Sequence, residues 1–135
     1  MKLLFYIKLY AMMVPVFFLI DMLWLGWLAK GFYRKHLDYI LSPQVNWTAA
    51  IVFYLIYIAG IMIFAVLPAL DKASFSKALI LGALFGFFTY ATYDLTNLAT
   101  LKDWPLPVVF VDILWGTVLC ASVSAAGFAA GKWLS

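Results

Sequence analysis

Three aspartates lie inside long apolar stretches of the sequence, where ionisable side chains are costly. Asp21, Asp94 and Asp112 each interrupt such a stretch, and a charged side chain within a bilayer costs about 2.5–3.5 kcal/mol on insertion scales. Residues of this kind normally face a cavity or a partner. If two of the carboxyl groups meet, they cannot both be charged comfortably at low dielectric, so one is protonated or paired with a cation. The chemistry open to them is acid–base catalysis, proton-coupled transport or binding of a cationic ligand, and the sequence does not choose.

A short motif repeats around two of these aspartates. Residues 20–24 and 111–115 share the pattern apolar-Asp-x-Leu-Trp. Asp and Trp three positions apart lie on one helical face, so the repeat predicts that two carboxylates and the indoles of Trp24 and Trp115 surround a common cavity. A chance match stays open, because leucine is abundant and the glycines that follow are out of step by one residue.

More polar and aromatic side chains fall at the same predicted depth. Residues 90, 93, 94 and 97 are spaced i, i+3, i+4 and i+7 and therefore share one helical face. Anchoring at the membrane interface is the alternative role for the tyrosines, a polar contact at a helix end for Asp94, and a solvated position for His36. Trp47 and Trp104 are predicted to be interface anchors. The candidate ligand-binding or acid–base residues are Asp21, Trp24, Tyr54, Tyr57, Tyr90, Tyr93, Asp94, Asn97, Asp112, Trp115 and Arg34, with His36 and Lys102 also at the rim.

The composition indicates that these stretches are membrane spans. Of 135 residues, 67% are hydrophobic and only 11% are charged, against roughly a quarter charged in soluble domains. Spans of about 20 residues cross the roughly 30 Å hydrocarbon core. We expect one domain over residues 1–135, an all-α integral membrane protein with a four-transmembrane-helix bundle. The predicted spans are about 9–29, 47–70, 78–98 and 107–131, the first being a retained span because it is too long for a signal peptide.

The connections between the spans differ in length. Residues 30–46 form the one long connection, in which Tyr33, Leu37, Ile40 and Leu41 are spaced as the apolar stripe of a short interfacial helix. The dipeptide 42–43 is predicted to end that helix, and Ser42 or Asn46 to cap the second span. The other two connections are short, so neighbouring spans run antiparallel.

The charge pattern indicates the orientation of the protein in the membrane and the kinds of partner it excludes. The nine basic residues are scattered, which excludes a nucleic-acid-binding stripe. Four spans place five lysines with the termini and four basic residues at the other side, so we expect cytoplasmic termini by the positive-inside rule, with insertion in both orientations left open. The residues with the termini are Lys2, Lys8, Lys72, Lys77 and Lys132, and the others are Lys30, Arg34, Lys35 and Lys102.

Small residues indicate how the helices pack. Gly82 and Gly86, like Gly127 and Gly131, have the GxxxG spacing that lets helices approach closely. Packing within one chain is favoured, and a homodimer is the alternative. Cys120 is the one cysteine, and no metal-binding or cofactor motif is present, so we expect no metal and no cofactor. The expected partners are membrane lipids and a lipophilic small molecule.

Several runs together resemble a known family. They are residues 21–26, 31–34, 90–100, 104–105 and 112–116, of which Tyr-Asp-Leu-Thr-Asn-Leu-Ala-Thr is the most specific. On these the chain resembles small bacterial predicted membrane proteins catalogued as domain of unknown function 2177, over nearly its whole length. The resemblance implies a bacterial inner-membrane protein with four spans and implies no activity.

Two functions remain open from the sequence. The first is a binding protein or small enzyme whose cavity, in one leaflet, takes a lipid or another lipophilic ligand. The second is a proton-coupled exporter, because size, span number and intramembrane carboxylates are similar to those of small multidrug resistance transporters. The first is preferred, since the polar groups gather in one half of the predicted bundle.

Overall fold

Helices account for 86% of the chain in the computed structural model, which describes residues 2–135 and has no strand within that range. Four helical stretches are long and apolar enough to cross a membrane, and the predicted all-α membrane bundle is confirmed. Each helical stretch extends beyond its predicted span at one end or at both, because an apolar window stops at charged residues whereas a helix continues through them. The first stretch ends at Leu28, one residue before its predicted end. The four stretches are Lys2–Leu28, Trp47–Asp71, Phe75–Thr100 and Leu106–Leu134.

Two of the spans contain a π-helical turn. The turns divide these spans into separate elements, so the structure has eight elements over the described residues. Such turns are rare and often lie at functional sites. In chain order the elements are α1 (Lys2–Leu23), the π-turn η1 (Trp24–Leu28), α2 (Lys30–Leu37), α3 (Trp47–Ile61), the π-turn η2 (Met62–Val66), α4 (Leu67–Asp71), α5 (Phe75–Thr100) and α6 (Leu106–Leu134).

Local sequence explains several helix ends. The Asn46 side chain accepts a hydrogen bond from the Ala49 amide at 3.1 Å, so the predicted cap of the second span is confirmed. The short interfacial helix is α2, which ends at Leu37, earlier than its apolar stripe suggested. Ile40 and Leu41 lie in the following turn and are exposed.

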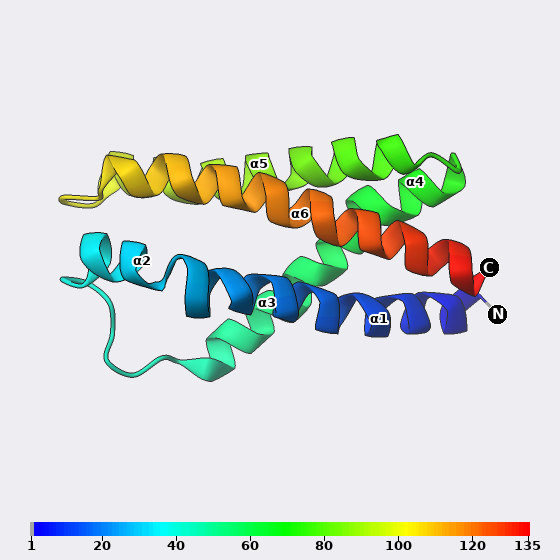
Figure 1. Ribbon diagram of the computed structural model, residues 1–135, viewed down its shortest axis with the longest axis horizontal. Coiled ribbons are helices and arrows are strands. Elements are labelled where there is room, and N and C mark those ends of the chain that lie inside the picture. Colours follow the sequence, from blue (N-terminus) through cyan, green and yellow to red (C-terminus); the bar gives the residue numbers. More distant parts are fainter. Residues whose placement is uncertain (1) are drawn as a thin grey trace.

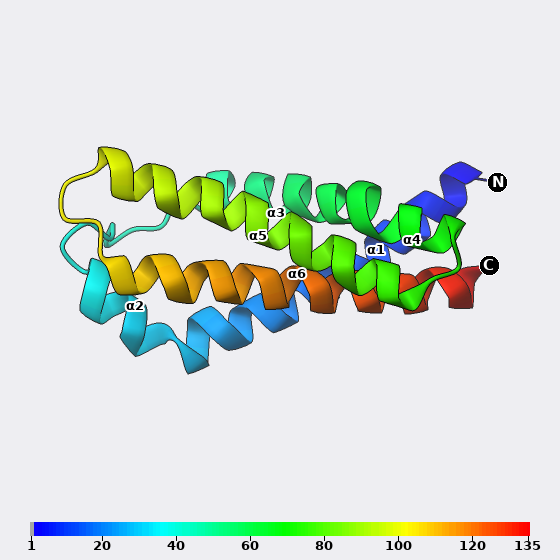
Figure 2. The same cartoon turned by 90° about the horizontal axis from the view of Figure 1, so that it is seen from above.

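The spans run antiparallel and the described chain ends lie together (Figure 1). Seen from the side, α1 and α6 lie one above the other, and α3 crosses the bundle obliquely, so that its first turns are far from α6. The view from above shows α5 running alongside α6 (Figure 2). These two helices share the most extensive contact in the bundle.

The glycine motifs make close packing within the chain. A Cβ atom on Gly82 would lie 2.6 Å from both the Cys120 carbonyl oxygen and the Ser124 Cβ, and one on Gly86 would overlap the Gly116 backbone. The second motif, in α6, faces Met13 of α1 and the η2–α4 segment. Both GxxxG pairs therefore bring spans of the same chain together.

The two halves of the bundle are packed differently. A core of buried apolar side chains fills the half near the termini, where α1, α3, η2 and α6 meet. At the opposite end, a smaller cluster joins Leu37 of α2 to Trp104, Val108 and Val109 at the start of α6. Between these two clusters lies a cavity.

Candidate functional site

A cavity of about 510 Å³ opens in the half of the bundle that carries α2. Its volume falls in the range of about 300–1,000 Å³ that is common for small-molecule sites. Every long helix and α2 contribute to its wall. The lining residues are Asp21, Leu25, Tyr33, Leu37, Phe53, Tyr54, Tyr57, Thr89, Tyr90, Tyr93, Trp104, Val108, Asp112 and Trp115.

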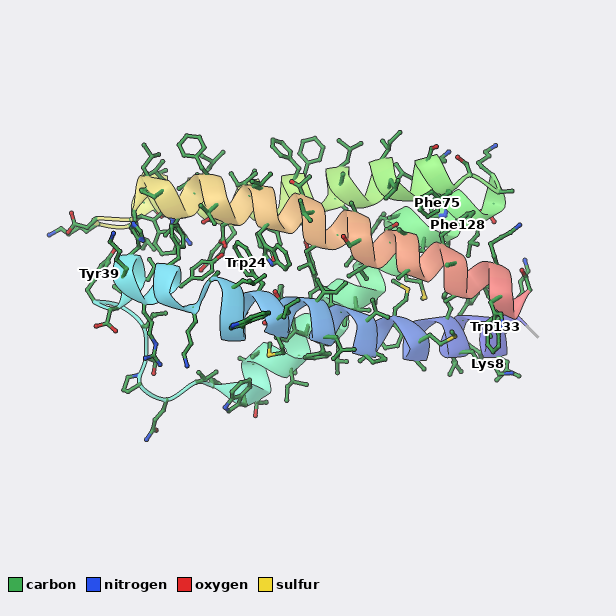
Figure 3. All side chains as sticks on the ribbon, viewed as in Figure 1. Lys8, Trp24, Tyr39, Phe75, Phe128 and Trp133 are labelled. Carbon is green, nitrogen blue, oxygen red and sulfur yellow. The ribbon has the colours of Figure 1, made fainter. Side chains whose placement is uncertain are left out.

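One wall is built from the repeated motif. The indoles of Trp24 and Trp115 stack with centroids 4.5 Å apart and planes inclined by 8°. Trp115 donates its Nε1 hydrogen to Oδ1 of Asp21 at 3.3 Å, so the tryptophan of the second copy holds the aspartate of the first. Trp24, labelled in Figure 3, points from η1 into the space beneath α6. The Tyr54 hydroxyl also lies close to the Asp21 carboxyl group.

The second aspartate is held through an intermediate residue. Trp24 donates its Nε1 hydrogen to the Tyr33 hydroxyl at 3.1 Å, and Tyr33 donates a short hydrogen bond to Oδ1 of Asp112. Tyr33 belongs to α2, so these two hydrogen bonds connect α2 to both η1 and α6. Burial, followed by the neighbouring Asp112 carboxylate, raises the pKa of the Tyr33 hydroxyl well above its ordinary value. Tyr33 is therefore a neutral donor at physiological pH.

The floor of the cavity is also hydrogen-bonded. The Tyr57 hydroxyl lies 2.6 Å from Thr89 Oγ1 and 3.1 Å from Cys120 Sγ, which links α3, α5 and α6. Tyr90 packs edge to face against Tyr57 with centroids 6.3 Å apart. Gly116 makes room for Tyr90, because a Cβ atom there would overlap the phenol ring. The floor is thus fixed by polar contacts above the apolar core.

Trp104 closes the end of the cavity near α2. We predicted an interface anchor, and this was wrong: Trp104 is only 7% exposed, packs with Leu37 and Val108, and lines the cavity. Its ring also meets Tyr93 edge to face at 6.0 Å. The cause is the packing of Leu37 of α2 against the indole. Trp47, at the start of α3, is exposed, as expected of an anchor.

Asp94 lies behind the cavity wall. It is fully buried, and neither carboxyl oxygen has a hydrogen-bond partner among residues 2–135. Its polar neighbours are Asp112 and Trp104, and the Trp104 Nε1 hydrogen is likewise unpaired. Two buried acceptors and one buried donor therefore lie together unpaired, which is costly for a protein interior.

The structure brings most of the predicted site residues to one place. Trp24 stacks behind Trp115, while Asp94 and the half-buried Asn97 do not line the cavity. Arg34 and Lys102 are exposed and outside the lining, and His36 Nδ1 lies 3.0 Å from the Phe32 carbonyl oxygen. The predicted residues in the lining are Asp21, Tyr54, Tyr57, Tyr90, Tyr93, Asp112 and Trp115.

Sequence reasoning missed several lining residues. Tyr33 was placed only in the stripe of the surface helix, and nothing in the sequence pairs it with Asp112. Thr89 could have been found, because it lies four residues before Tyr93 on the same helical face. The apolar lining residues Leu25, Phe53 and Val108 carry no signal that separates them from lipid-facing positions.

Comparison with known families identifies the chain. It belongs to the family described as predicted membrane protein (DUF2177), whose model matches residues 6–129. No curated protein and no solved structure matches the chain. The family supplies the membrane location and no activity, so function has to be argued from the cavity.

Proposed function

We propose that this family member holds a lipid or another lipophilic ligand in its cavity, as a membrane-embedded binding protein or small enzyme. The observation that carries the proposal is the cavity itself: a space of about 510 Å³ with two aspartates in a largely aromatic wall. Ligand sites are commonly apolar with a few convergent polar groups. The carboxylates distinguish this space from a hollow between α1 and α6 in the other half, whose lining is entirely apolar.

The position of the cavity supports a ligand taken from the bilayer. It lies within the spans, and several of its lining side chains are also exposed on the helix surface that lipid would cover. The opposite half of the bundle has an apolar core, and the hollow of about 360 Å³ between α1 and α6 there has an entirely apolar lining. A one-leaflet site needs no polar path across that core.

A proton-coupled exporter is the second candidate. It is favoured by the two cavity aspartates, since intramembrane carboxylates often serve as proton relays. It is disfavoured by the apolar half, because alternating access would require a large rearrangement or an antiparallel second copy to supply polar groups there. Substrate-driven proton flux in vesicles that is abolished by Asp21→Asn would make this candidate the better one.

We further propose a bacterial inner-membrane location with cytoplasmic termini. The five lysines at the end of the bundle that carries the termini, against four basic residues at the other end, support this orientation. The cavity then lies in the outer leaflet of the inner membrane.

Co-purification of lipid tests the proposal. The protein is purified from its membranes in a neutral detergent, and bound lipids are extracted and identified by mass spectrometry. Val108→Trp fills the cavity from α6, whereas Val118→Trp places the same side chain on the exposed face of the same helix. We expect a stoichiometric lipophilic molecule in the wild type and in Val118→Trp, and its loss from folded Val108→Trp. Equal lipid in both variants would contradict the proposal.

A further inference from the structure

The cavity carries negative groups without a matching cation. Asp21 and Asp112 line it, and no Lys, Arg or His of residues 2–135 does. The four basic residues at this end of the bundle are all exposed. A buried carboxylate without a counter-charge is costly, so a ligand that brings a positive charge would be favoured here over a neutral or negative one.

The hydrogen bonds leave these aspartates available. Trp115 and Tyr33 each donate to Oδ1 of one aspartate, and no hydrogen bond among the described residues reaches Oδ2 of either. The Tyr54 hydroxyl lies close to Asp21, and the Asp94 carboxyl group lies beside Asp112. Both donors are rigid aromatic groups held by the Trp24 stack and its hydrogen bond to Tyr33. The two carboxylates are therefore fixed in position before a ligand arrives.

A third carboxyl group lies next to the site. Asp94 is fully buried beside Asp112, and both of its oxygens lack a hydrogen-bond partner among the described residues. It lies outside the lining, so a ligand in the cavity would contact Asp112 and not Asp94. No basic side chain of residues 2–135 stands in the wall to offset it.

The rest of the wall suits a cation as well. Eight of the fourteen lining residues are aromatic, five of them tyrosines. The electron-rich faces of aromatic rings attract ammonium groups, by about 0.5–2 kcal/mol per contact depending on desolvation. An aromatic wall with carboxylates is the chemistry by which proteins recognise ammonium groups.

The mouth of the cavity faces lipid. Leu25, Phe53 and Tyr93 line the cavity and are also 38%, 50% and 55% exposed, respectively. All three lie within membrane-spanning stretches. A ligand that uses this opening comes from the bilayer and leaves its apolar part there.

We propose that the cavity takes the ammonium headgroup of an amphiphile between Asp21 and Asp112, with the hydrocarbon chain leaving past Phe53 and Tyr93 into the bilayer. This inference rests on the proposed function, because it names the class of lipophilic ligand that the same cavity binds. The two carboxylates supply charge and hydrogen-bond acceptors, and the aromatic wall excludes water around the headgroup.

Headgroup selectivity tests the inference. Radiolabelled hexadecylamine, hexadecanol and palmitate have chains of equal length and differ in headgroup. Their binding to the purified full-length protein is measured by scintillation proximity in a neutral maltoside detergent. We expect the amine to bind about tenfold or more tightly than the alcohol, as hydrogen bonds to charged groups imply, and palmitate to bind most weakly.

The variants assign the selectivity to the two aspartates. The double variant Asp21→Asn with Asp112→Asn should lower amine affinity at least about tenfold and leave hexadecanol binding unchanged. Asp71→Asn, an exposed aspartate at the other end of the bundle, is the matched control and should change neither.

The outcomes separate the two proposals. Equal affinity for amine and alcohol, or tightest binding of palmitate, would overturn the headgroup inference and leave a cavity for lipophilic ligands. No binding of any probe by the folded wild type would overturn both. If the double variant does not fold, the headgroup series with the wild type still decides.

Discussion

Trp24 and Trp115 stack face to face across the bundle, with ring centroids 4.5 Å apart and planes inclined by 8°. They come from two copies of one short motif on helices that run in opposite directions. Each indole serves the aspartate of the other copy: Trp115 bonds Asp21 directly, and Trp24 reaches Asp112 through Tyr33. The stack is therefore the joint through which both cavity carboxylates are held.

We expect the two tryptophans to be energetically coupled. In a double-mutant cycle with Trp24→Ala and Trp115→Ala, the coupling in the free energy of unfolding should be about 0.5–1.5 kcal/mol, the range for aromatic pairs. Unfolding in detergent by added dodecyl sulfate gives the four stabilities. Trp27, exposed in η1, is the control, and a cycle of Trp27→Ala with Trp115→Ala should show no coupling. Additive effects of Trp24 and Trp115 would contradict the role of the stack.

The Tyr33 hydroxyl should stabilise the fold. Tyr33→Phe leaves Trp24 Nε1 and Asp112 without this partner, so it should lower the free energy of unfolding by about 1.5–3 kcal/mol, the range for hydrogen bonds to charged groups. Tyr6→Phe, in α1 near the chain end, should change it little. If Tyr33→Phe left the free energy of unfolding unchanged, this would contradict the role of Tyr33 in linking α2 to the two motif copies.

The same pair of proteins gives a pH dependence. Because burial raises the pKa of folded Tyr33, the unfolded wild type loses this proton at lower pH than the folded wild type does. The stability difference between wild type and Tyr33→Phe should therefore be constant below about pH 9 and shrink above about pH 10, the ordinary tyrosine pKa. A difference that stays constant to about pH 11 would contradict a buried neutral Tyr33.

Close packing of α5 on α6 should tolerate no extra methyl group. Gly86→Ala puts a Cβ into the Gly116 backbone, so it should cost about 1–3 kcal/mol of unfolding free energy or more, as overpacking does. Gly26→Ala meets nothing within 4 Å and should be neutral or slightly stabilising. Both are compared by the same unfolding titration, and equal effects would show that the two helices are not in this contact.

An even number of spans places both termini on one side. Cysteines introduced at Lys2 and Lys132 should react with a membrane-impermeant maleimide from the same side of intact cells or vesicles, while Cys120 is buried and stays unlabelled. Labelling of the two positions from opposite sides of the membrane would contradict a topology with four spans.

The sequence predicted the spans well because apolar length alone determines them. It also predicted that the motif repeat brings two aspartates and two tryptophans to one region, since three-residue spacing places each pair on one helical face. It did not predict which indole bonds which aspartate, because that depends on how α1 and α6 meet. Trp104 was misplaced for a related reason: whether an aromatic at a helix start faces lipid or the interior is decided by α2 packing over it.

An experimental structure of the protein purified with its native lipids tests the central claim most directly. We expect elongated density in the cavity that begins between Asp21 and Asp112 and leaves toward lipid past Phe53 and Tyr93. The Trp24–Trp115 stack should stand beside it unchanged. A cavity filled by its own side chains, or one that holds only water while Asp21 and Asp112 face lipid, would contradict the account.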